Sequence, residues 1–466
     1  MLLPHKTPKV TVYIPTYNYG KYIEQAIDSV LKQTMDDWEL IVINDGSTDN
    51  TSEILKKHEG HPKIRILEQQ NRGLTVSNNI ALRSSEGKYL MRLDADDYLD
   101  ENALLVLSNI LDNRPEVGLV YPDYYVIDEE GEILEIVRRK KIGEEVELLD
   151  LPAHGACTMF RKECLVRIRG YEESVDRQDG YDIWLKFIRV FEPANVNVPL
   201  FYYRQHPESI TKDQQKLLRA RKAIKKDFVG KYLEHSIPRV LGVIPVLKKS
   251  LTYPYSAFAE LAGKPLLWYT IHEALQTKML DKVVVTSDDD EVLKYAGDLP
   301  GITTIKRPPE LTKSSAQVQS IVLHTLNVLK EKDKTYSPDA IMVLFTNIPL
   351  RRAIHIEEAI NTMAIFDVDS VISVCEELAL CYTHDRNGLV PIWSKRGVRL
   401  ERESIYKQNG AILLSKVNVI TEKDFWGKKI GHTVMLPEES IKINTQFEFW
   451  LAEKITSEWN AVDSEA

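Results

Sequence analysis

The sequence has few cysteines and no long hydrophobic segment. Its four cysteines, Cys157, Cys164, Cys375 and Cys381, have neither the spacing of a metal site nor the density of a disulfide framework. No window approaches a run of about 18 apolar residues, so we expect no membrane-spanning helix. The start of the chain, MLLPHKTPKV, lacks the apolar core of a signal peptide. We therefore expect a cytoplasmic protein that would reach membrane-linked substrates only from the inner face of the membrane.

Positive charge is not in excess either. The net charge of −9 provides no general electrostatic footprint for nucleic acid. The hydrophobic content of 43% and charged content of 28% are typical of a folded globular protein. A chain of 466 residues is too long for one ordinary core, which predicts two domains of roughly 200 residues each.

The predicted domain boundary lies near residue 235. A helical pattern rich in lysine and arginine occupies residues 211–235, and the apolar strand pattern of a new domain follows it. We therefore expect domains at residues 1–235 and 236–466. The basic helix is interpreted as a solvated face, or alternatively as a surface for anionic lipid headgroups or a diphosphate-linked acceptor.

The first half opens with the pattern of a βαβ unit. Residues 10–18 read as a strand, and residues 21–34 place apolar side chains at helical spacing. A second strand at residues 38–45 ends on Asp45, after which Asp49 or Thr51 could cap the next helix. Ligands bind at the carboxyl ends of strands in open parallel sheets, so we expect the site there.

A third expected strand, KYLMRLDADDYLD at residues 88–100, carries three clustered acids. Alternate side chains of a strand face the same way, which predicts that Asp94 and Asp96 point together. Carboxylates brought this close repel one another unless a cation lies between them, and hard oxygen ligands suit Mg²⁺ or Mn²⁺. The alternative reading is a solvated acidic turn in which Asp97 caps the following helix.

The order of motifs in residues 9–235 resembles the family 2 glycosyltransferases of GT-A fold. The matching segments are IPTYN, INDGSTDNT, NRGLTVSNN and LDADDYLD, followed by RQDGYDIWLKF and YYRQHPESIT. The resemblance implies a nucleotide-diphosphate sugar donor, either UDP-, dTDP- or GDP-linked. It also implies a saccharide or lipid-linked glycan acceptor, as in bacterial surface glycan synthesis.

The resemblance also implies roles for individual residues. Donor binding falls to Pro15, Thr16, Asp45, Asp94, Arg204 and His206, with the last two facing the diphosphate. Asp94 and Asp96 would bind the metal, Mn²⁺ or Mg²⁺. Where the family often has an arginine, this chain has Asn78.

The catalytic base implied by the resemblance is Asp179, with Asp182 as the second candidate. Gln178-Asp179 and Asp179-Gly180 are both open as the counterpart of the family's acidic pair, and Asp182 could instead be a helix N-cap. The implied mechanism is direct displacement with inversion at the anomeric carbon, in which the base removes the proton of the acceptor hydroxyl.

The second half resembles the cytidylyltransferases that charge sialic-acid-like sugars with CMP, from about residue 238 to 457. The matching segments include GVIPV, AGKPLLWYTIHEAL, SDDDEV, DAIMVLFTNIPLR and KQNGAILL. This resemblance completes the predicted fold class, α/β with two Rossmann-like domains.

Residues that the second resemblance would require for catalysis are replaced. Its glycine-rich phosphate loop corresponds here to VLKKSLTYPYS, with Leu247, Lys248, Lys249 and Leu251 in place of the arginine, two glycines and a lysine. A polar glutamine corresponds to Phe345, and the paired metal-binding aspartates correspond to Lys442 and Asn444. Asp288, Asp289 and Asp290 persist and read as a polar turn with a helix cap. We therefore predict a domain that no longer activates sugars.

Three hypotheses remain open for the whole chain. The second domain could be a non-catalytic module for binding a sugar or for homodimerisation, and its candidate sugar-facing residues are Gly263, Lys264, Ser315, Gln317, Asn409 and Gly410. Alternatively, the chain is a bifunctional enzyme that also forms CMP-sialic, CMP-legionaminic or CMP-pseudaminic acid. The remaining hypothesis is a non-enzymatic scaffold, against which the intact acid cluster of the first half argues.

Overall fold

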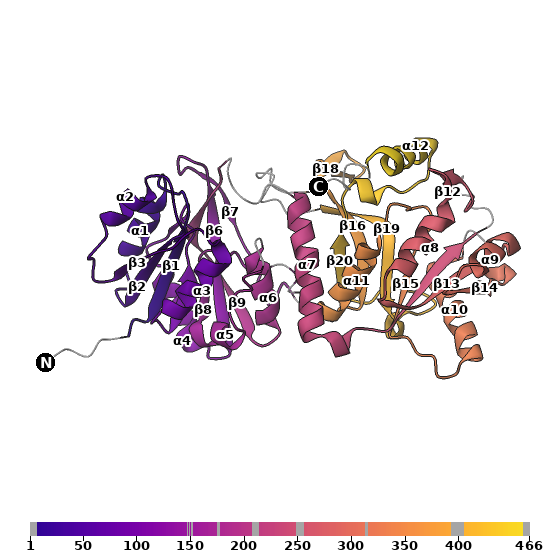
Figure 1. Cartoon of the computed structure of the whole chain (residues 1–466), viewed down its shortest axis with the longest axis horizontal. Helices are drawn as coiled ribbons and strands as arrows, with labels where there is room; N and C mark the ends of the chain where they lie inside the picture. The colour runs from indigo at the N-terminus through magenta and orange to yellow at the C-terminus, as the bar shows by residue number, and fades with distance from the viewer. Residues whose placement is uncertain are drawn as a thin grey trace. The chain divides into compact units, whose positions relative to one another are not determined.

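The computed structural model of the chain divides into two compact units. It describes residues 7–146, 148, 150, 152–174, 178–206, 214–247, 256–312, 316–392 and 405–459. The first unit contains the described residues up to Ile224, and the second begins at Lys225 (Figure 1). This division falls inside helix α7 (Gln214–Tyr232), eleven residues before the boundary predicted from composition.

The first unit is built on a mixed sheet whose core is parallel. The order of its strands is β3-β2-β1-β4-β8-β6-β9-β5, with β7 paired to β6. The parallel neighbours β1 and β2 confirm the βαβ unit expected from the sequence. Strand bounds are β1 Val10–Thr16, β2 Trp38–Asn44, β3 Ile64–Glu68, β4 Tyr89–Arg92, β5 Tyr98–Leu99, β6 Val117–Ile127, β7 Ile133–Val137, β8 Met159–Arg161 and β9 Glu192–Arg204.

Helices flank this sheet. One core cluster joins alternate side chains of β1 to buried apolar residues of α1 and α4, as the helical spacing at residues 21–34 predicts. Helix α3 packs against β1, β2 and α5, and it carries the polar residues that reach the candidate site. Bounds are α1 Ile23–Leu31, α2 Thr51–Lys56, α3 Leu74–Ser84, α4 Ala103–Asn113, α5 Lys162–Arg167 and α6 Asp179–Ile188.

The acidic segment differs from the strand expected at residues 88–100. β4 ends at Arg92, a turn follows, and the chain resumes as the two-residue strand β5. The turn is closed by the backbone N–H of Asp97, which donates to the carbonyl of Asp94 at 3.2 Å. Asp94 and Asp96 therefore lie in a turn, and strand alternation is the wrong reason for their proximity.

The second unit is a second α/β sandwich, which confirms the predicted fold class. Its main sheet has the order β14-β13-β10-β15-β19-β16-β20, and only the pairs made by β19 are antiparallel. Strand bounds are β10 Val240–Val246, β13 Leu280–Ser287, β14 Ile302–Lys306, β15 Ala340–Val343, β16 Ser370–Glu377, β19 Ile405–Lys416 and β20 Ile430–Val434. Two separate hairpins are β11 Glu260–Leu261 with β12 Lys264–Pro265, and β17 Tyr382–His384 with β18 Leu389–Pro391.

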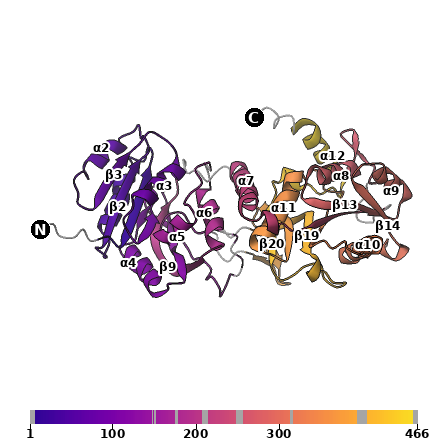
Figure 2. The same cartoon turned by 60° about the horizontal axis from the view of Figure 1, so that its bottom comes forward.

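Helices also surround the sheet of the second unit (Figure 2). A core cluster joins α10 to the apolar side chains of β10 and β15, whereas α8 and α11 contact each other and the strands of the same sheet. Bounds are α8 Leu266–Gln276, α9 Asp290–Gly297, α10 Val318–Lys332, α11 Ala353–Phe366 and α12 Gln446–Lys454.

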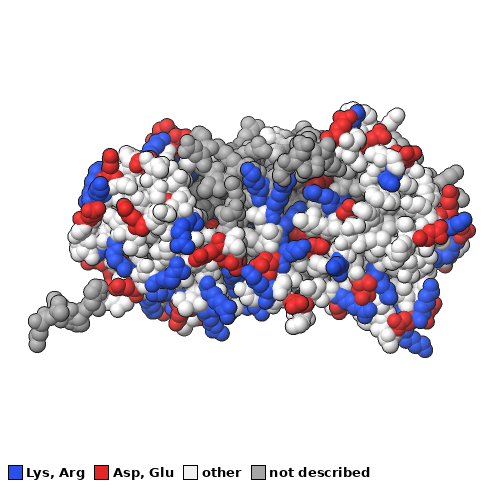
Figure 3. Space-filling view, in the orientation of Figure 1, with Lys and Arg blue, Asp and Glu red and all other residues white. Residues whose placement is uncertain are grey.

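Charged side chains of both signs are interspersed over the face shown in Figure 3. Part of the positive charge of α7 is compensated within the second unit. The Lys225 ammonium lies 3.4 Å from the Glu358 carboxylate, with both side chains buried, and Lys226 pairs with Glu357. Across the described ranges, no helix combines the length and the apolar character needed to cross a bilayer.

Candidate functional site

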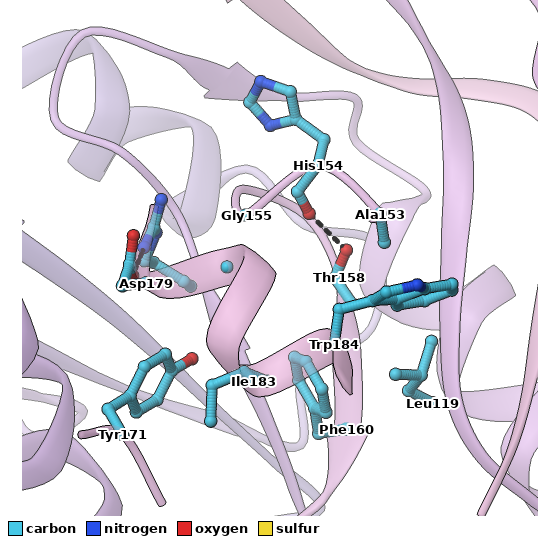
Figure 4. Close-up of a pocket in the computed structure, with 12 residues that line it drawn as sticks. Leu119, Ala153, His154, Gly155, Thr158, Phe160, Tyr171, Asp179, Ile183 and Trp184 are labelled. Atoms are coloured by element: carbon cyan, nitrogen blue, oxygen red, sulfur yellow. Dashed lines mark hydrogen bonds and ion pairs between the residues drawn. The ribbon is translucent and has the colours of Figure 1, made fainter. Parts of the chain in front are cut away.

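A pocket in the first unit is lined by Asp179 at the beginning of α6. The free space within it is about 340 Å³, a volume that includes open solvent. Figure 4 shows Asp179 and Tyr171 on one side of this pocket and Trp184 with Leu119 on the other. Arg92, at the carboxyl end of β4, also contributes to the lining. The pocket therefore combines an apolar wall with a charged edge, a composition common to ligand sites.

The charged edge is held together by Arg92. Its Nη1 donates to Asp179 Oδ2 at 2.7 Å, and its Nε lies 2.7 Å from Asp94 Oδ1. Asp179 Oδ2 also accepts from Asn78 Nδ2 at 2.9 Å. The structure thus brings the first candidate base next to one of the predicted metal-binding acids, through a shared guanidinium.

The three clustered acids have three different environments. Burial raises the pKa of Asp94; Arg92 opposes this shift and Asp96 adds to it. Burial, together with the charges of Asp96 and Asp94, raises the pKa of Asp97 well above its usual value. Asp97 accepts from the backbone N–H of Arg204 through Oδ1, and its Oδ2 is buried with no hydrogen-bond partner among the residues that the structure describes. Asp97 is therefore a structural carboxyl, whereas the side chains of Asp94 and Asp96 are only partly buried.

His206 lies beside the acid pair, with its Nε2 3.0 Å from Asp96 Oδ2. Arg204 is almost fully buried and donates to backbone carbonyls of Asp96, Asp128 and Glu129 and to the side chain of Gln25. Its guanidinium therefore fastens the acidic turn to neighbouring loops, and the structure does not present it as an open phosphate ligand.

Pro15 and Thr16 end β1 as expected, and Asp45 follows β2. Thr16 Oγ1 is buried, and none of the described residues forms a hydrogen bond with it. The carboxylate of Asp45 accepts from the backbone N–H groups of Arg72 and Gly73, each at 2.8 Å, and from Gln69 Nε2 at 2.7 Å. Asp45 therefore shapes the loop that leads into α3.

Asp182, the second candidate base, lies apart from the pocket lining. Its carboxylate is 2.6 Å from Lys186 Nζ, and both side chains are buried. Burial raises its pKa, while Lys186 opposes the shift. Asp182 is the fourth residue of α6, so it is not the N-cap of this helix, which was the alternative role predicted for it.

Two residues of the site were not identified from the sequence. The sequence around Arg92 contains a local signal, because an arginine among the apolar residues of a strand needs a buried counter-ion. The sequence does not show which residues are its two partners. His154 lines the pocket, and its ring packs among Tyr124, Phe201 and Tyr203. Burial lowers the pKa of His154 to about 3, so its ring is neutral at physiological pH.

The donor set near Asp96 fits a divalent cation only in part. No group of three or more histidine, cysteine or carboxylate side chains close enough to hold a metal occurs among the described residues. The two carboxylates of Asp94 and Asp96 are nevertheless oxygen donors of the kind that Mn²⁺ or Mg²⁺ accepts. Asp94 and Asp96 would be the ligands that the protein itself contributes to such a cation.

The described residues that were proposed for sugar binding in the second unit come from separate elements. Gly263 and Lys264 lie exposed at the β11–β12 turn, where the Lys264 ammonium lies over the Trp268 ring. Gln317 precedes α10 and accepts a hydrogen bond from Gln319. Ser315, Lys248, Lys249 and Leu251 lie outside the described residues, whereas Leu247 directly follows β10.

Asn409 is buried, and its amide is used internally. Its Oδ1 accepts from Ser373 Oγ at 2.5 Å and from the Ala411 N–H, and its Nδ2 donates to Ser440 Oγ at 2.9 Å. Gly410 follows with φ of 78°, a conformation that favours glycine. This pair therefore shapes strand β19, and its amide is not directed at a ligand.

Two of the segments with replaced positions in the second unit, those of Phe345 and of Lys442 with Asn444, lie next to each other. The backbone N–H of Ile443, between Lys442 and Asn444, donates to the carbonyl of Asn347 two residues after Phe345. Both Lys442 and Asn444 are exposed, and Asn444 Nδ2 donates to the Lys442 carbonyl. Asp289 caps α9 by accepting from the N–H of Glu291, which confirms the reading of its segment as a turn and cap.

Comparison with protein families places one known domain in each unit. Residues 11–169 match the model described as "Glycosyl transferase family 2", and residues 256–364 match the model described as "Cytidylyltransferase". Both resemblances drawn from the motifs are thereby confirmed at the level of domains.

The chain matches curated relatives over part of their length. Chondroitin synthase from Escherichia coli is 32% identical over 193 residues, which cover 41% of this chain and 28% of that protein. Hyaluronan synthase from Pasteurella multocida is 32% identical over 196 residues, 41% of this chain and 20% of that protein. This chain therefore spans under a third of either relative.

Two solved structures are similar to part of the chain. S. aureus TarS 1-349 in complex with UDP-GlcNAc is 18% identical, with a TM-score of 0.40 over 47% of this chain and 66% of that one. The mannosyltransferase PcManGT from Pyrobaculum calidifontis, in complex with GDP-Man and Mn²⁺, is 20% identical, with a TM-score of 0.37 over 50% of this chain and 66% of that one.

Proposed function

Because residues 11–169 form a family 2 glycosyltransferase domain, we propose that the chain transfers a sugar from a nucleotide-diphosphate donor to a saccharide or glycoconjugate acceptor, with inversion. The observation that carries this proposal is the position of Asp179, which lines a pocket and is separated from Asp94 by a single guanidinium. The names of the relatives, which are glycan synthases, support a saccharide acceptor in surface glycan synthesis.

The proposed reaction needs one base and one place for the leaving diphosphate. Asp179 takes the proton of the acceptor hydroxyl, while the hydroxyl oxygen of the acceptor forms a bond to the anomeric carbon. The bond from that carbon to the diphosphate oxygen breaks, and the diphosphate leaves with the electron pair. Asp179 is suited to this step because it borders the pocket, whereas the Asp182 carboxylate is bound to Lys186.

Asp94 and Asp96 are the proposed ligands of Mn²⁺ or Mg²⁺. A bound cation would supply electrostatic stabilisation of the diphosphate. His206 holds Asp96 in place through its Nε2 contact, and Arg204 fixes the backbone of the turn that carries Asp96 and Asp97. The buried hydroxyl of Thr16 and the loop held by Asp45 remain the proposed nucleoside side of the site.

For the second unit we propose a module without cytidylyltransferase activity that binds a sugar or mediates homodimerisation. The exposed Lys442 brings a positive charge to a position that would otherwise bind a cation, and it lies near the loop that carries Phe345. Two like charges repel, so this replacement disfavours metal binding there. The domain boundary at residue 235 and a peripheral membrane contact through α7 remain proposals.

A screen on the full chain tests the transferase proposal. Thermal shifts and nucleotide release are measured with UDP-GlcNAc, UDP-glucuronic acid, dTDP-glucose and GDP-mannose, with and without Mn²⁺, and with saccharide acceptors. We expect one donor to stabilise the chain in a metal-dependent way and to release its nucleotide. Asp179→Asn should abolish release, while the matched surface variant Glu116→Gln should keep it. Full release by Asp179→Asn would refute the assignment of the base.

A further inference from the structure

Arg92 contacts both halves of the proposed reaction centre, the Asp179 side and the Asp94 side. Its guanidinium donates to Asp179 through Nη1 at 2.7 Å and to Asp94 through Nη2 at 3.2 Å, with Nε 2.7 Å from Asp94 Oδ1. The side chains of Arg92 and Asp179 are 10% and 13% exposed, so solvent screens this pair poorly. Charge-assisted bonds of this kind set orientation as well as energy.

The surroundings of Arg92 are shaped to hold this position. Asn78, which is fully buried in α3, donates to the same Asp179 oxygen as Arg92 and thereby fixes the carboxylate from a second direction. Gly155 leaves the space that the guanidinium occupies, because a Cβ at this position would lie 2.3 Å from Arg92 Nη2. The other titratable groups that interact electrostatically with Arg92 or Asp94 are Tyr13, Tyr171, His154, Asp96 and Asp97.

A buried cation shared by two carboxylates couples them energetically. Removing one carboxylate leaves the guanidinium with one partner, and removing both leaves an uncompensated charge, which is costly in a protein interior. Conversely, without the guanidinium each carboxylate would be buried near another negative charge. With Arg92 present, we therefore expect Asp94 and Asp179 to stabilise the fold. Without Arg92, we expect them to destabilise it.

We propose that Arg92 is a positioning residue that aims the Asp179 carboxylate at the acceptor hydroxyl and ties it to Asp94 on the donor side. This inference rests on the proposed function of the site. When Asp179 takes the proton it becomes neutral and its attraction to Arg92 weakens. The two contacts to Asp94 then keep the guanidinium in place, so the geometry of the site persists while the sugar bond forms.

Melting temperatures of the substrate-free full chain test the shared contact. Asp179→Asn and Asp94→Asn are measured singly and together, in the wild-type and Arg92→Met backgrounds. With Arg92 present, each substitution should lower the melting temperature, and the double substitution should lower it by more than the sum. In the Arg92→Met background the same substitutions should leave it unchanged or raise it. Equal losses of melting temperature in both backgrounds would contradict the proposal that Arg92 couples the two acids.

Kinetics separate positioning from a purely structural role. With the donor that releases most nucleotide in the screen, Arg92→Lys and Gly155→Ala should lower kcat at least about tenfold while the KM for the donor changes little, because lysine cannot hold both acids and the added Cβ displaces the guanidinium. The matched control is Arg161→Lys in β8, whose buried guanidinium donates to the backbone carbonyls of Leu111, Arg114 and Val117. This control should lose stability and retain kcat.

A wild-type kcat in Arg92→Lys and Gly155→Ala would overturn the positioning role. Nucleotide release from none of the four donors would refute the proposed function instead, and the melting series would still report whether Arg92 couples the two carboxylates. The two failures are therefore distinguishable.

Discussion

The carboxylate of Asp182 and the ammonium group of Lys186 lie 2.6 Å apart, one turn from each other on α6, with 7% and 8% of their side chains exposed. Asp179, three residues before Asp182, lines the pocket. Two acids of one short motif thus have different surroundings, one in an internal ion pair and the other at a pocket edge.

This difference predicts that the same substitution, aspartate to asparagine, mainly lowers stability at one position and mainly lowers kcat at the other. Asp182→Asn should destabilise the first unit by about 3 kcal/mol, because it leaves the Lys186 ammonium buried without its counter-ion. Asp179→Asn should also lower the melting temperature, because Arg92 loses one partner, but its main effect should be to lower kcat by a factor on the order of 100 or more. Chemical denaturation and initial rates on both variants check this pair. A normal kcat in Asp179→Asn with a lost kcat in Asp182→Asn would reverse the assignment.

Removal of the divalent cation should stop transfer. We expect EDTA to abolish nucleotide release and Mn²⁺ or Mg²⁺ to restore it, because the carboxylates of Asp94 and Asp96 would repel the diphosphate unless they held a cation that offsets its charge. Asp96→Ala should fail to recover on adding metal. Asp112→Asn, which alters a carboxylate paired with Lys9 and Lys88, serves as the control and should recover fully. Undiminished release in EDTA would contradict the metal proposal.

His154 should make the first unit sensitive to acid. Its pKa of about 3 in the folded chain lies below the ordinary value of 6.5, so the unfolded chain binds a proton that the folded chain does not. Stability is therefore complete above pH 6.5 and falls as the pH drops from 6.5 towards 3, by about 2 kcal/mol at pH 5. His154→Gln should remove this part of the pH dependence. Urea denaturation of both chains at pH 7 and pH 5 measures it, and parallel losses in the two would contradict it.

The second unit should not form a CMP-sugar. When the full chain is incubated with CTP, Mg²⁺ and sialic, legionaminic or pseudaminic acid, we expect no CMP-sugar by mass spectrometry, because Lys442 repels a cation at the place where one would be needed. The double substitution Lys442→Asp with Asn444→Asp should create measurable Mg²⁺ binding in the second unit. Product formation by the wild-type chain would establish the bifunctional hypothesis instead.

Local patterns predicted the framework of the site well. Apolar periodicity located β1, α1 and β2, because burial of one face repeats with the period of a strand or a helix. Polar residues at strand ends then indicated where a ligand would bind. The strand expected at residues 88–100 was wrong because the acidic residues turn the chain after Arg92, and alternation alone does not reveal that turn.

The sequence by itself determined the two α/β domains, the order of their motifs and the candidate acids, since these follow from periodicity and from residues close together in the chain. Only the tertiary structure decided which of the candidate side chains are bound by other groups of the protein. Asp45 is bound by the loop at residues 69–73, Arg204 by backbone carbonyls and Asp182 by Lys186, whereas Asp179 meets a guanidinium 87 residues away at the edge of a pocket. Contacts of that range depend on how whole elements pack, and no local pattern of residues records them.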